Sequence, residues 1–323
     1  MILIFSTPTD NDTNLVMDWL RHLNEPVVRI NDEELMEGKT HFFYDENIPL
    51  NSYFICYENK IYLSQIRVVW FRKFGFLKNY QSIIGDNNDL MTYVRSEFNA
   101  LRTLLCKLLK NKKWLFDINK LSSKIEILQK AKLHCLQTPK TIVTTQKEKL
   151  TEFFLQNNQS IITKSIAEAK YVNFRENAYM FHTHLIENLD CFENEFSPSL
   201  FQQYVEKDIE LRVFFLNDKC YSMAIFSQNN EKTKVDFRNY DRNLPNRFVP
   251  FKLPHSIEQK IIAFMKDINL NTGSLDIIKS KHNGEYYFLE VNPSGQFGMV
   301  SIPCNYNLHK KTAYFLIELN NEN

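Results

Sequence analysis

Two apolar segments separated by a short polar turn constrain the fold of this chain more than any other feature. Residues 274–279 and 287–292 have the composition of buried β-strands, and residues 282–284 between them read His-Asn-Gly. A hairpin loop of this kind commonly ends on a glycine in the left-handed region. Glu290 and Asn292 stand two positions apart on the second strand, so their side chains project from one face. We therefore predict an antiparallel hairpin that presents a carboxylate and an amide side by side.

A pair of facing carboxylates follows from the register of this hairpin. A three-residue loop makes Lys281 face Glu285, and counting outward then places Asp276 opposite Glu290. Like charges directly opposite on a sheet are destabilising, so a cation between them would explain the arrangement. Asp276, Glu290 and Asn292 offer the oxygen donors that Mg²⁺ prefers, and they are the candidate metal ligands. A surface hairpin with scattered acids is the alternative, and a one-residue slip would send the side chains to opposite faces.

Composition places the chain among well-cored globular proteins. It has 323 residues, of which 44% are hydrophobic and 14% aromatic, and its formal net charge is +1. The near-neutral charge gives no general attraction to nucleic acid or an anionic membrane, and no apolar run is long enough to span a bilayer. The six cysteines include no Cys-x-x-Cys pair, which favours reduced thiols in a cytoplasm. No P-loop or Rossmann fingerprint occurs, so a nucleotide would have to bind through another motif.

The order of predicted strands and helices indicates an α/β protein with three units. Residues 1–112 begin with a strand, an amphipathic helix and a second strand, and they end at a lysine-rich cluster. Residues 113–198 alternate helix and strand and have the size of a lid. Residues 199–323 contain a second hairpin, a helix that opens at Pro254 and the hairpin described above.

Two helix starts are predicted in the middle unit. Ser123 with Glu126, and Thr145 with Glu148, have the spacing of a capping box. In that motif the hydroxyl accepts a backbone hydrogen bond and the glutamate accepts one in return. We therefore expect a helix to begin at each position and a strand to follow it.

Two lysines of the middle unit are candidate phosphate ligands. Lys124 stands at the first helix start, and Lys164 ends the apolar strand 160–164. An ammonium at such an edge can reach a phosphate as a point charge. Taken alone, each would more often be a solvated surface lysine.

Further polar residues follow these lysines in a set order, namely Gln203 to Val205, then Glu210 and Arg212, then Asp236 and Arg238, and finally Asp276, Glu290 and Asn292. In order and spacing they resemble the ATP-grasp superfamily, in which lysines on both sides of a lid contact nucleotide phosphates. There a hinge strand binds adenine through its backbone, an acid contacts the ribose, and an acid/acid/Asn set holds Mg²⁺. The residues that carry the resemblance here are Lys124, Lys164, Gln203, Tyr204, Val205, Glu210, Arg212, Asp236, Arg238, Asp276, Glu290 and Asn292.

Longer motifs resemble one group within that superfamily, the graspetide peptide maturases. These are microviridin-type ATP-grasp macrocyclases, and the similarity is greatest to the grasp-with-spasm group. It covers nearly the whole chain and is most specific at residues 288–297, Phe-Leu-Glu-Val-Asn-Pro-Ser-Gly-Gln-Phe. The other matching segments are 69–73, 124–139 with its following strand, 203–212, 236–240 and 253–254.

The resemblance implies a fold and a set of ligands. It implies an ATP-grasp fold with a pre-ATP-grasp domain (1–112), a central lid domain (113–198) and a catalytic domain (199–323), in a cytoplasmic homodimer. ATP and Mg²⁺ are the implied cofactors. The implied ATP ligands are Lys124, Lys164, Gln203, Tyr204, Val205 and Glu210, the metal ligands Asp276, Glu290 and Asn292, and the catalytic residues Arg212, Asp236 and Arg238.

The resemblance also implies a reaction. ATP phosphorylates a side-chain carboxylate of a ribosomal precursor peptide that carries a leader segment, and a Ser/Thr hydroxyl or Lys amine of the same peptide displaces the phosphate. The product is an ω-ester or ω-amide ring. Cations must gather where a carboxylate meets the γ-phosphate, and Arg212 and Arg238 can hold such anions by a bidentate fork. Asp236 would orient Arg238 or accept the nucleophile's proton; a cross-strand salt bridge between the two is the alternative.

The sequence departs from the ATP-grasp pattern at one segment, and it is compatible with two other functions. Residues 165–170 contain no glycine, whereas many ATP-grasp enzymes have a glycine-rich loop there, so this segment could be a mobile lid or a peptide-facing surface. His182 and His184 alternate as in a strand and are more typical of exposed strand histidines than of metal ligands. A ligase that adds free amino acids to a protein would share the ATP site, and a non-catalytic peptide-binding module is the alternative from another class.

Overall fold

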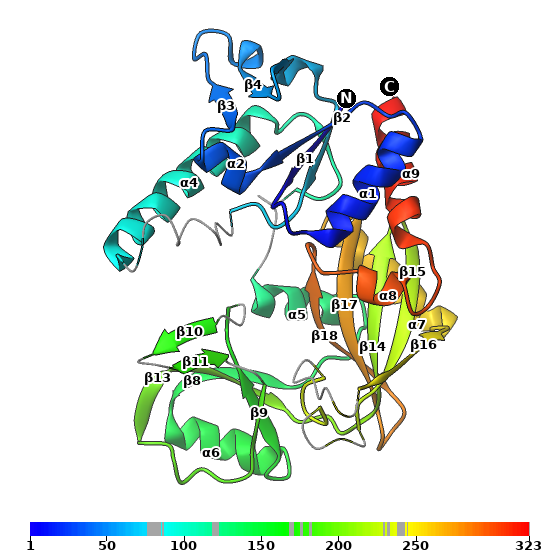
Figure 1. The fold of residues 1–323 in the computed structure, drawn as a ribbon. Coiled ribbons are helices and arrows are strands. Elements are labelled where there is room, and N and C mark those ends of the chain that lie inside the picture. Colours follow the sequence, from blue (N-terminus) through cyan, green and yellow to red (C-terminus); the bar gives the residue numbers. More distant parts are fainter. Residues whose placement is uncertain are drawn as a thin grey trace.

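The computed structural model describes residues 1–75, 85, 87–117, 123–167, 171–174, 177–180, 183–228, 230, 233–237, 243 and 245–322 (Figure 1). Its strands form one parallel sheet near the N-terminus, a five-stranded antiparallel sheet in the C-terminal part, and three smaller antiparallel sheets. Over these residues, no helix has both the length and the apolar character needed to cross a bilayer.

The N-terminal sheet is parallel and buried on both faces, as its uninterrupted apolar strands require. Its strands are, in spatial order, β2 (Val27–Asn31), β1 (Ile2–Ser6), β6 (Val68–Phe71) and β7 (Lys113–Trp114). Leu3 and Phe5 pack toward α4 (Asn88–Leu108), whereas Ile2 and Ile4 pack toward α1 (Asn11–His22) and α9 (Leu308–Asn321). The helix α9 thus returns from the other end of the chain to cover this sheet (Figure 1). The predicted β-α-β start is confirmed.

A smaller antiparallel sheet sits at the edge of this unit. Its strands are β3 (Thr40–Phe43), β4 (Tyr53–Cys56) and β5 (Asn59–Tyr62), and it is flanked by α2 (Asp32–Met36) and the 3₁₀ turns η1 (Pro49–Asn51) and η2 (Leu63–Gln65).

The middle sheet, in the order β12-β9-β13-β8, forms a separate layer covered by one helix. Its strands are β12 (His184–Ile186), β9 (Ile161–Lys164), β13 (Glu195–Gln203) and β8 (Thr141–Gln146). The helix α6 (Lys147–Gln156) packs on it through Leu150, Phe153 and Phe154. A two-stranded ribbon, β10 (Tyr171–Phe174) with β11 (Asn177–Met180), lies nearby.

Of the two predicted capping boxes, one is confirmed and one is wrong. Ser123 and Glu126 exchange hydrogen bonds at the start of α5 (Lys124–Leu133). At α6, the first helical residue is Lys147 and Gln146 is the N-cap, without a side-chain bond. Strand β8 continues through Thr145 to Gln146, because β13 pairs with it there through Glu195. Strand pairing therefore overrode the local capping signal.

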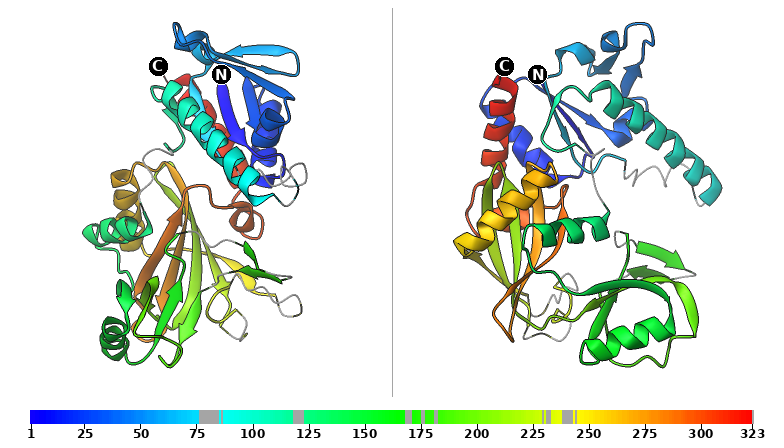
Figure 2. Two further views of the ribbon diagram at one scale, coloured as in Figure 1. Left: turned by 90° about the vertical axis from the view of Figure 1, so that its left-hand side faces the viewer. Right: turned by 180° about the vertical axis from the view of Figure 1, so that it is seen from behind.

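The C-terminal sheet is antiparallel and carries helices on both faces. Its strands are, in spatial order, β16 (Arg247–Phe251), β15 (Lys219–Phe226), β14 (Lys207–Leu216), β17 (Thr272–Ser280) and β18 (Tyr286–Asn292). The view from behind shows α5 and α7 (His255–Asp267) on one side of it (Figure 2). There Phe264 of α7 packs on Phe288, in the same apolar cluster as Leu211. The opposite face is covered at one end by α8 (Gly298–Ser301) and α9 and is open at the other.

The hairpin of β17 and β18 has the predicted facing carboxylates but a different register near its turn. Asp276 pairs with Glu290, as predicted. The backbone of Ser280 bonds to Glu285, so Lys281 belongs to the loop and does not face Glu285 as expected. A β-bulge at Leu289 adds one residue to β18 and restores the counted pairing.

The division of the chain at residues 112 and 198 stays a prediction. Strand β13 spans the second position and joins the middle sheet to β14 through residues 204–206. Two isolated bridges connect the units further, Phe116 with Leu270 and Gln137 with Tyr287.

Candidate active site

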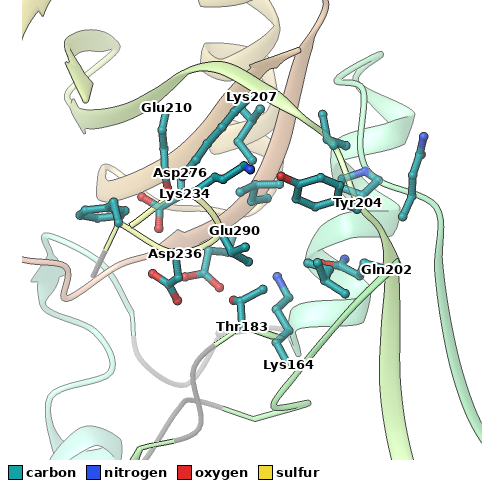
Figure 3. Close-up of a pocket in the computed structure, with 18 residues that line it drawn as sticks. Lys164, Thr183, Gln202, Tyr204, Lys207, Glu210, Lys234, Asp236, Asp276 and Glu290 are labelled. Carbon is teal, nitrogen blue, oxygen red and sulfur yellow. Dashed lines mark hydrogen bonds and ion pairs between the residues drawn. The ribbon is translucent and has the colours of Figure 1, made fainter. Parts of the chain in front are cut away.

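A cleft lies between the middle sheet and the open face of the C-terminal sheet (Figure 3). The strands β9, β13, β14, β17 and β18 line it, together with residues 234–237. Figure 3 shows the side chains of Lys164, Asp236 and Glu290 pointing into the same space. Of the residues singled out from the sequence, those that line the cleft are Lys164, Gln203, Tyr204, Val205, Glu210, Asp236, Asp276 and Glu290.

Acidic and basic groups meet on the open face of β14, β17 and β18. Arg212 on β14 pairs with Asp276 across the sheet, and its guanidinium forms an ion pair with that carboxylate. Asp276 is only 5% exposed, so this charge is held in a largely dry setting. The Nε of Arg212 is buried and has no hydrogen-bond partner among the described residues.

Asn292 continues the same face of β18. It pairs with Ser274, two positions along from the pairing of Asp276 with Glu290. Its Oδ1 accepts a hydrogen bond from the backbone N–H of Ser294 at 3.0 Å, which fixes the side chain in an Asx turn. The three oxygen-bearing side chains therefore share one face, as the sequence predicted.

The two predicted lysines approach this face from different elements. Lys124, the first residue of α5, has its Nζ 3.6 Å from Oε2 of Glu290. Lys164 ends β9 and reaches into the cleft from the middle sheet (Figure 3). Positive charge thus borders the carboxylates on both sides.

The connection between β13 and β14 contains the predicted hinge. Gln203 bonds with Lys140 through its backbone, and its side-chain oxygen also accepts from the Lys140 N–H. The side chain of Gln203 is therefore engaged with the strand next to it. The N–H of Tyr204 bonds to Ser160. Both residues tie the hinge to the middle sheet.

The neighbouring Gln202, which the sequence reading missed, is the fully buried amide of the cleft. The hydroxyl of Thr141 donates to the carbonyl of Pro139, so it can only accept from Gln202. The amide nitrogen of Gln202 must face Thr141, and its oxygen points the other way without a partner among the described residues. Strict alternation along β13 would have indicated that Gln202 and Gln203 face opposite sides.

Lys207 is a second residue that the sequence reading missed. Its Nζ lies 2.6 Å from Oε2 of Glu210, and both side chains are almost fully buried. Burial raises the pKa of Glu210, and the adjacent ammonium opposes that shift. In a regular strand residues three apart point to opposite faces. The two meet here because the register of β14 against β17 shifts between Lys207 and Ile209.

Solved structures share the fold of this chain. No family model matches the chain, and no curated protein matches it significantly. A RiPP-associated ATP-grasp ligase from Chryseobacterium gregarium, solved with ADP and a leader and core peptide, is 24% identical. Its TM-score is 0.83, with 98% of this chain and 96% of that chain covered. The chain has an ATP-grasp fold.

Two further ATP-grasp structures have a similar fold. Macrocyclase MdnC from Microcystis aeruginosa MRC, bound with precursor peptide MdnA, is 23% identical with a TM-score of 0.80 over 98% of this chain and 99% of that chain. ATP-grasp ligase PsnB, complexed with a phosphomimetic variant of its minimal precursor, Mg and ADP, is 15% identical with a TM-score of 0.74 over 99% and 98%. The ATP-grasp fold inferred from the sequence motifs is thereby confirmed.

Some predicted features of the ATP-grasp site fall outside the described residues. These are Arg238, His182 and residues 168–170 of the segment that lacks glycine. Asp236 is described, lines the cleft and is 6% exposed. His184 is exposed on β12, as its alternation indicated.

The donor set of the candidate site fits a hard divalent cation. Asp276, Glu290 and Asn292 offer two carboxylates and one amide oxygen, the donor types that Mg²⁺ accepts alongside water and phosphate. Within the described ranges no cluster of three or more His, Cys, Asp or Glu side chains has metal-binding geometry. A zinc-type centre is therefore not found there, and a shared protein–nucleotide site for Mg²⁺ needs no such cluster.

Proposed function

We propose that this chain is an ATP-dependent carboxylate ligase that forms rings in a ribosomal precursor peptide. ATP transfers its γ-phosphoryl group to an Asp or Glu side chain of the peptide, which gives an acyl phosphate and ADP. A hydroxyl or amine of the same peptide then attacks the acyl carbon, loses its proton and displaces inorganic phosphate. One ω-ester or ω-amide bond forms for each ATP consumed.

The observation that carries the proposal is the charge arrangement at the cleft. Asp276 and Glu290 face one another, Arg212 is paired with the first, and Lys124 lies beside the second. Joining a carboxylate to a triphosphate brings two anions together, which requires cations placed in advance. The guanidinium of Arg212 and the ammonium of Lys124 are such cations.

The residues divide into nucleotide-facing and substrate-facing groups. Lys124 and Lys164 would contact phosphates, while the hinge at residues 203–205 and Glu210 would hold the nucleoside. Asp276, Glu290 and Asn292 would hold Mg²⁺, which when bound neutralises phosphate charge. The carboxylate or acyl phosphate would be held by Arg212 and Arg238, with Asp236 orienting Arg238 or accepting a proton.

The peptide assignment draws on the structures that share the fold. The Chryseobacterium gregarium ligase was solved with a leader and core peptide, and MdnC with its precursor peptide. We extend this substrate class to the present chain, together with the microviridin-type product and the homodimer that the resemblance implies. The cysteine pattern adds the cytoplasmic location.

Intact mass of a candidate precursor peptide tests the proposal. The peptide encoded beside this chain is incubated with the protein, ATP and Mg²⁺, and ADP is followed in parallel. Loss of one water mass per ADP released supports cyclisation, and base hydrolysis then distinguishes ester from amide. Gain of an amino-acid mass would instead indicate the ligase that adds free amino acids, and tight binding without mass change a peptide-binding module. The Glu290→Gln variant should be inactive, whereas Glu285→Gln, on the exposed turn of the same hairpin, should retain activity.

A further inference from the structure

Arg72, at the end of the N-terminal sheet, is a deeply buried cation that contacts a distant loop. It follows β6 and is 2% exposed. Its Nε donates to Oδ2 of Asp10 at 3.1 Å, and its Nη2 donates to Oδ2 of Asp12 at 3.3 Å. Its Nη1 donates to the backbone carbonyl of Gly295 at 3.2 Å. One side chain thus links the β1–α1 connection to the 293–298 loop that follows β18.

Asp12 holds the other end of the same loop. Its Oδ2 accepts from the N–H of Phe297 at 3.0 Å and its Oδ1 from the N–H of Gly298 at 2.9 Å. The Nε2 of His309 lies 2.9 Å from Oδ1. Burial alone would raise the pKa of Asp12, but the bond to His309 and the charge of Arg72 hold it below its usual range. The carboxylate is therefore a charged acceptor for all of these donors.

The loop that is held in this way touches the candidate active site directly. It begins right after Asn292, whose side chain and carbonyl bond to the N–H groups of Ser294 and Gly295. A Cβ built on Gly295 would lie 2.6 Å from Cβ of Ser274 and 3.0 Å from Nη2 of Arg212. The loop backbone is therefore wedged between the network of Arg72 and the guanidinium of Arg212.

A second contact from the loop reaches the same strand. Phe297 stacks on Phe214 with ring centroids 4.5 Å apart, and the cation of Arg72 lies 5.4 Å from the Phe297 ring. Phe214 is two residues from Arg212 on β14, so both project from one face. Movement of the loop would shift the surroundings of Arg212 as well as Asn292.

We propose that Asp12 and Arg72 are positioning residues for the metal-ligand end of the site. They fix the 293–298 loop, and through it the orientations of Asn292 and Arg212, without touching nucleotide or peptide. This assignment rests on the proposed function, because it supposes that Asn292 binds the cation. A gain in folding stability would not by itself explain the ion-pair network of Asp12 and Arg72, because buried ion pairs often stabilise a protein no more than apolar packing does.

Metal and nucleotide binding by the intact protein provide the test. The variants are Asp12→Asn and Arg72→Lys. The control is Lys73→Met, since Lys73 contacts Asp10 at 2.8 Å and forms no hydrogen bond to the loop among the residues that the structure describes. An amide at position 12 cannot accept at both ends, because each carboxylate oxygen already serves two donors. Calorimetry measures Mg²⁺ binding in the presence of a non-hydrolysable ATP analogue, and analogue binding without metal. Thermal unfolding reports stability.

The expected result is a selective loss of metal affinity. Partners that orient a ligand typically contribute about 10- to 100-fold in metal affinity, so the Mg²⁺ dissociation constant should rise by that factor in both variants. Metal-free analogue binding and the Lys73→Met control should stay close to wild type. A lower melting temperature with unchanged Mg²⁺ affinity would overturn the proposal and leave the network a purely structural role.

A substitute variant and a wild-type measurement complete the experiment. If a variant does not fold, Gly298→Ala replaces it, because its Cβ would lie 2.7 Å from Oδ1 of Asp12 and should disturb the same contact. The wild-type protein is measured first. Absence of nucleotide-dependent Mg²⁺ binding there would refute the proposed function itself, whereas such binding with no change in the variants would refute only the positioning role.

Discussion

Replacing Gly295 by alanine is the sharpest test of how the site is built. The added Cβ would lie 2.6 Å from Cβ and 2.8 Å from Oγ of Ser274, and 3.0 Å from Nη2 of Arg212. Ser274 is fully buried on β17, which lies between β14 and β18, and has little room to retreat. The loop backbone must therefore move, by about 0.8 Å to restore ordinary van der Waals contact.

Both the stability and the rate should respond to this movement. Overpacking of a well-filled site costs about 1–3 kcal/mol, and we expect that loss in the free energy of unfolding. Asn292 and Arg212 border the displaced backbone, and a misplacement of about 1 Å near reacting groups can lower a rate about 100-fold. ADP formation with the cyclised peptide should fall accordingly.

A double-mutant cycle assigns the effect to this contact. Ser274→Gly removes both atoms of the closest approach, so Gly295→Ala should cost at least about 1 kcal/mol less in that background, measured by urea unfolding. Gly38→Ala is the control: its Cβ meets nothing within 4 Å and its φ of +71° makes it strained, so stability should fall while turnover of folded enzyme does not. Additive free energies, or normal turnover in Gly295→Ala, would refute the reasoning.

Three other outcomes are expected. Glu290→Gln should abolish ADP formation while near-UV circular dichroism stays native; an active variant would remove Glu290 from the metal site. Lys164→Ala should weaken ATP-analogue binding by calorimetry, and an unchanged dissociation constant would exclude a phosphate contact. The pKa values of Asp10 and Asp12 are held below 3.8, chiefly by Arg72 for the first and by His309 and Arg72 for the second, which outweighs burial. As the pH falls, these two carboxylates bind protons in the unfolded chain at a higher pH than in the folded protein. The free energy of unfolding should therefore decrease as the pH drops below about 4. Urea unfolding at a series of pH values should show that the free energy of unfolding falls less steeply with decreasing pH in Asp12→Asn than in the wild type. An identical pH dependence in the two proteins would contradict the assigned pKa shift of Asp12.

The hairpin shows how far local sequence rules extend. The pairing of Asp276 with Glu290 was predictable from strand composition and turn residues. The predicted register near the turn was wrong, because Lys281 belongs to the loop. The extra residue at the Leu289 bulge restores the predicted pairing of Asp276 with Glu290. Bulges depend on packing against neighbouring elements, and no residue type in β18 signalled this one.

The residues that were missed depend on long-range packing. Lys207 shares a face with Glu210 only because of a register shift, and the orientation of Gln202 follows from a hydroxyl on another strand. Asp12 and Arg72 lie far along the chain from the loop that they hold. Motifs indicated the candidate nucleotide-facing residues, whereas the supporting contacts became visible only in three dimensions.

The bond between Asp12 and His309 has a consequence for how the protein forms in the cell. The two residues are 297 positions apart, and His309 lies on α9, which packs against α1. A chain emerging from the ribosome cannot close this contact until the segment carrying residue 309 has left the exit tunnel. Domains generally fold as units during synthesis, and contacts this distant form late. A nascent chain would thus carry β17 and β18 before it could lock the loop beside Asn292, so the final arrangement of this loop should be acquired after the strands that precede it.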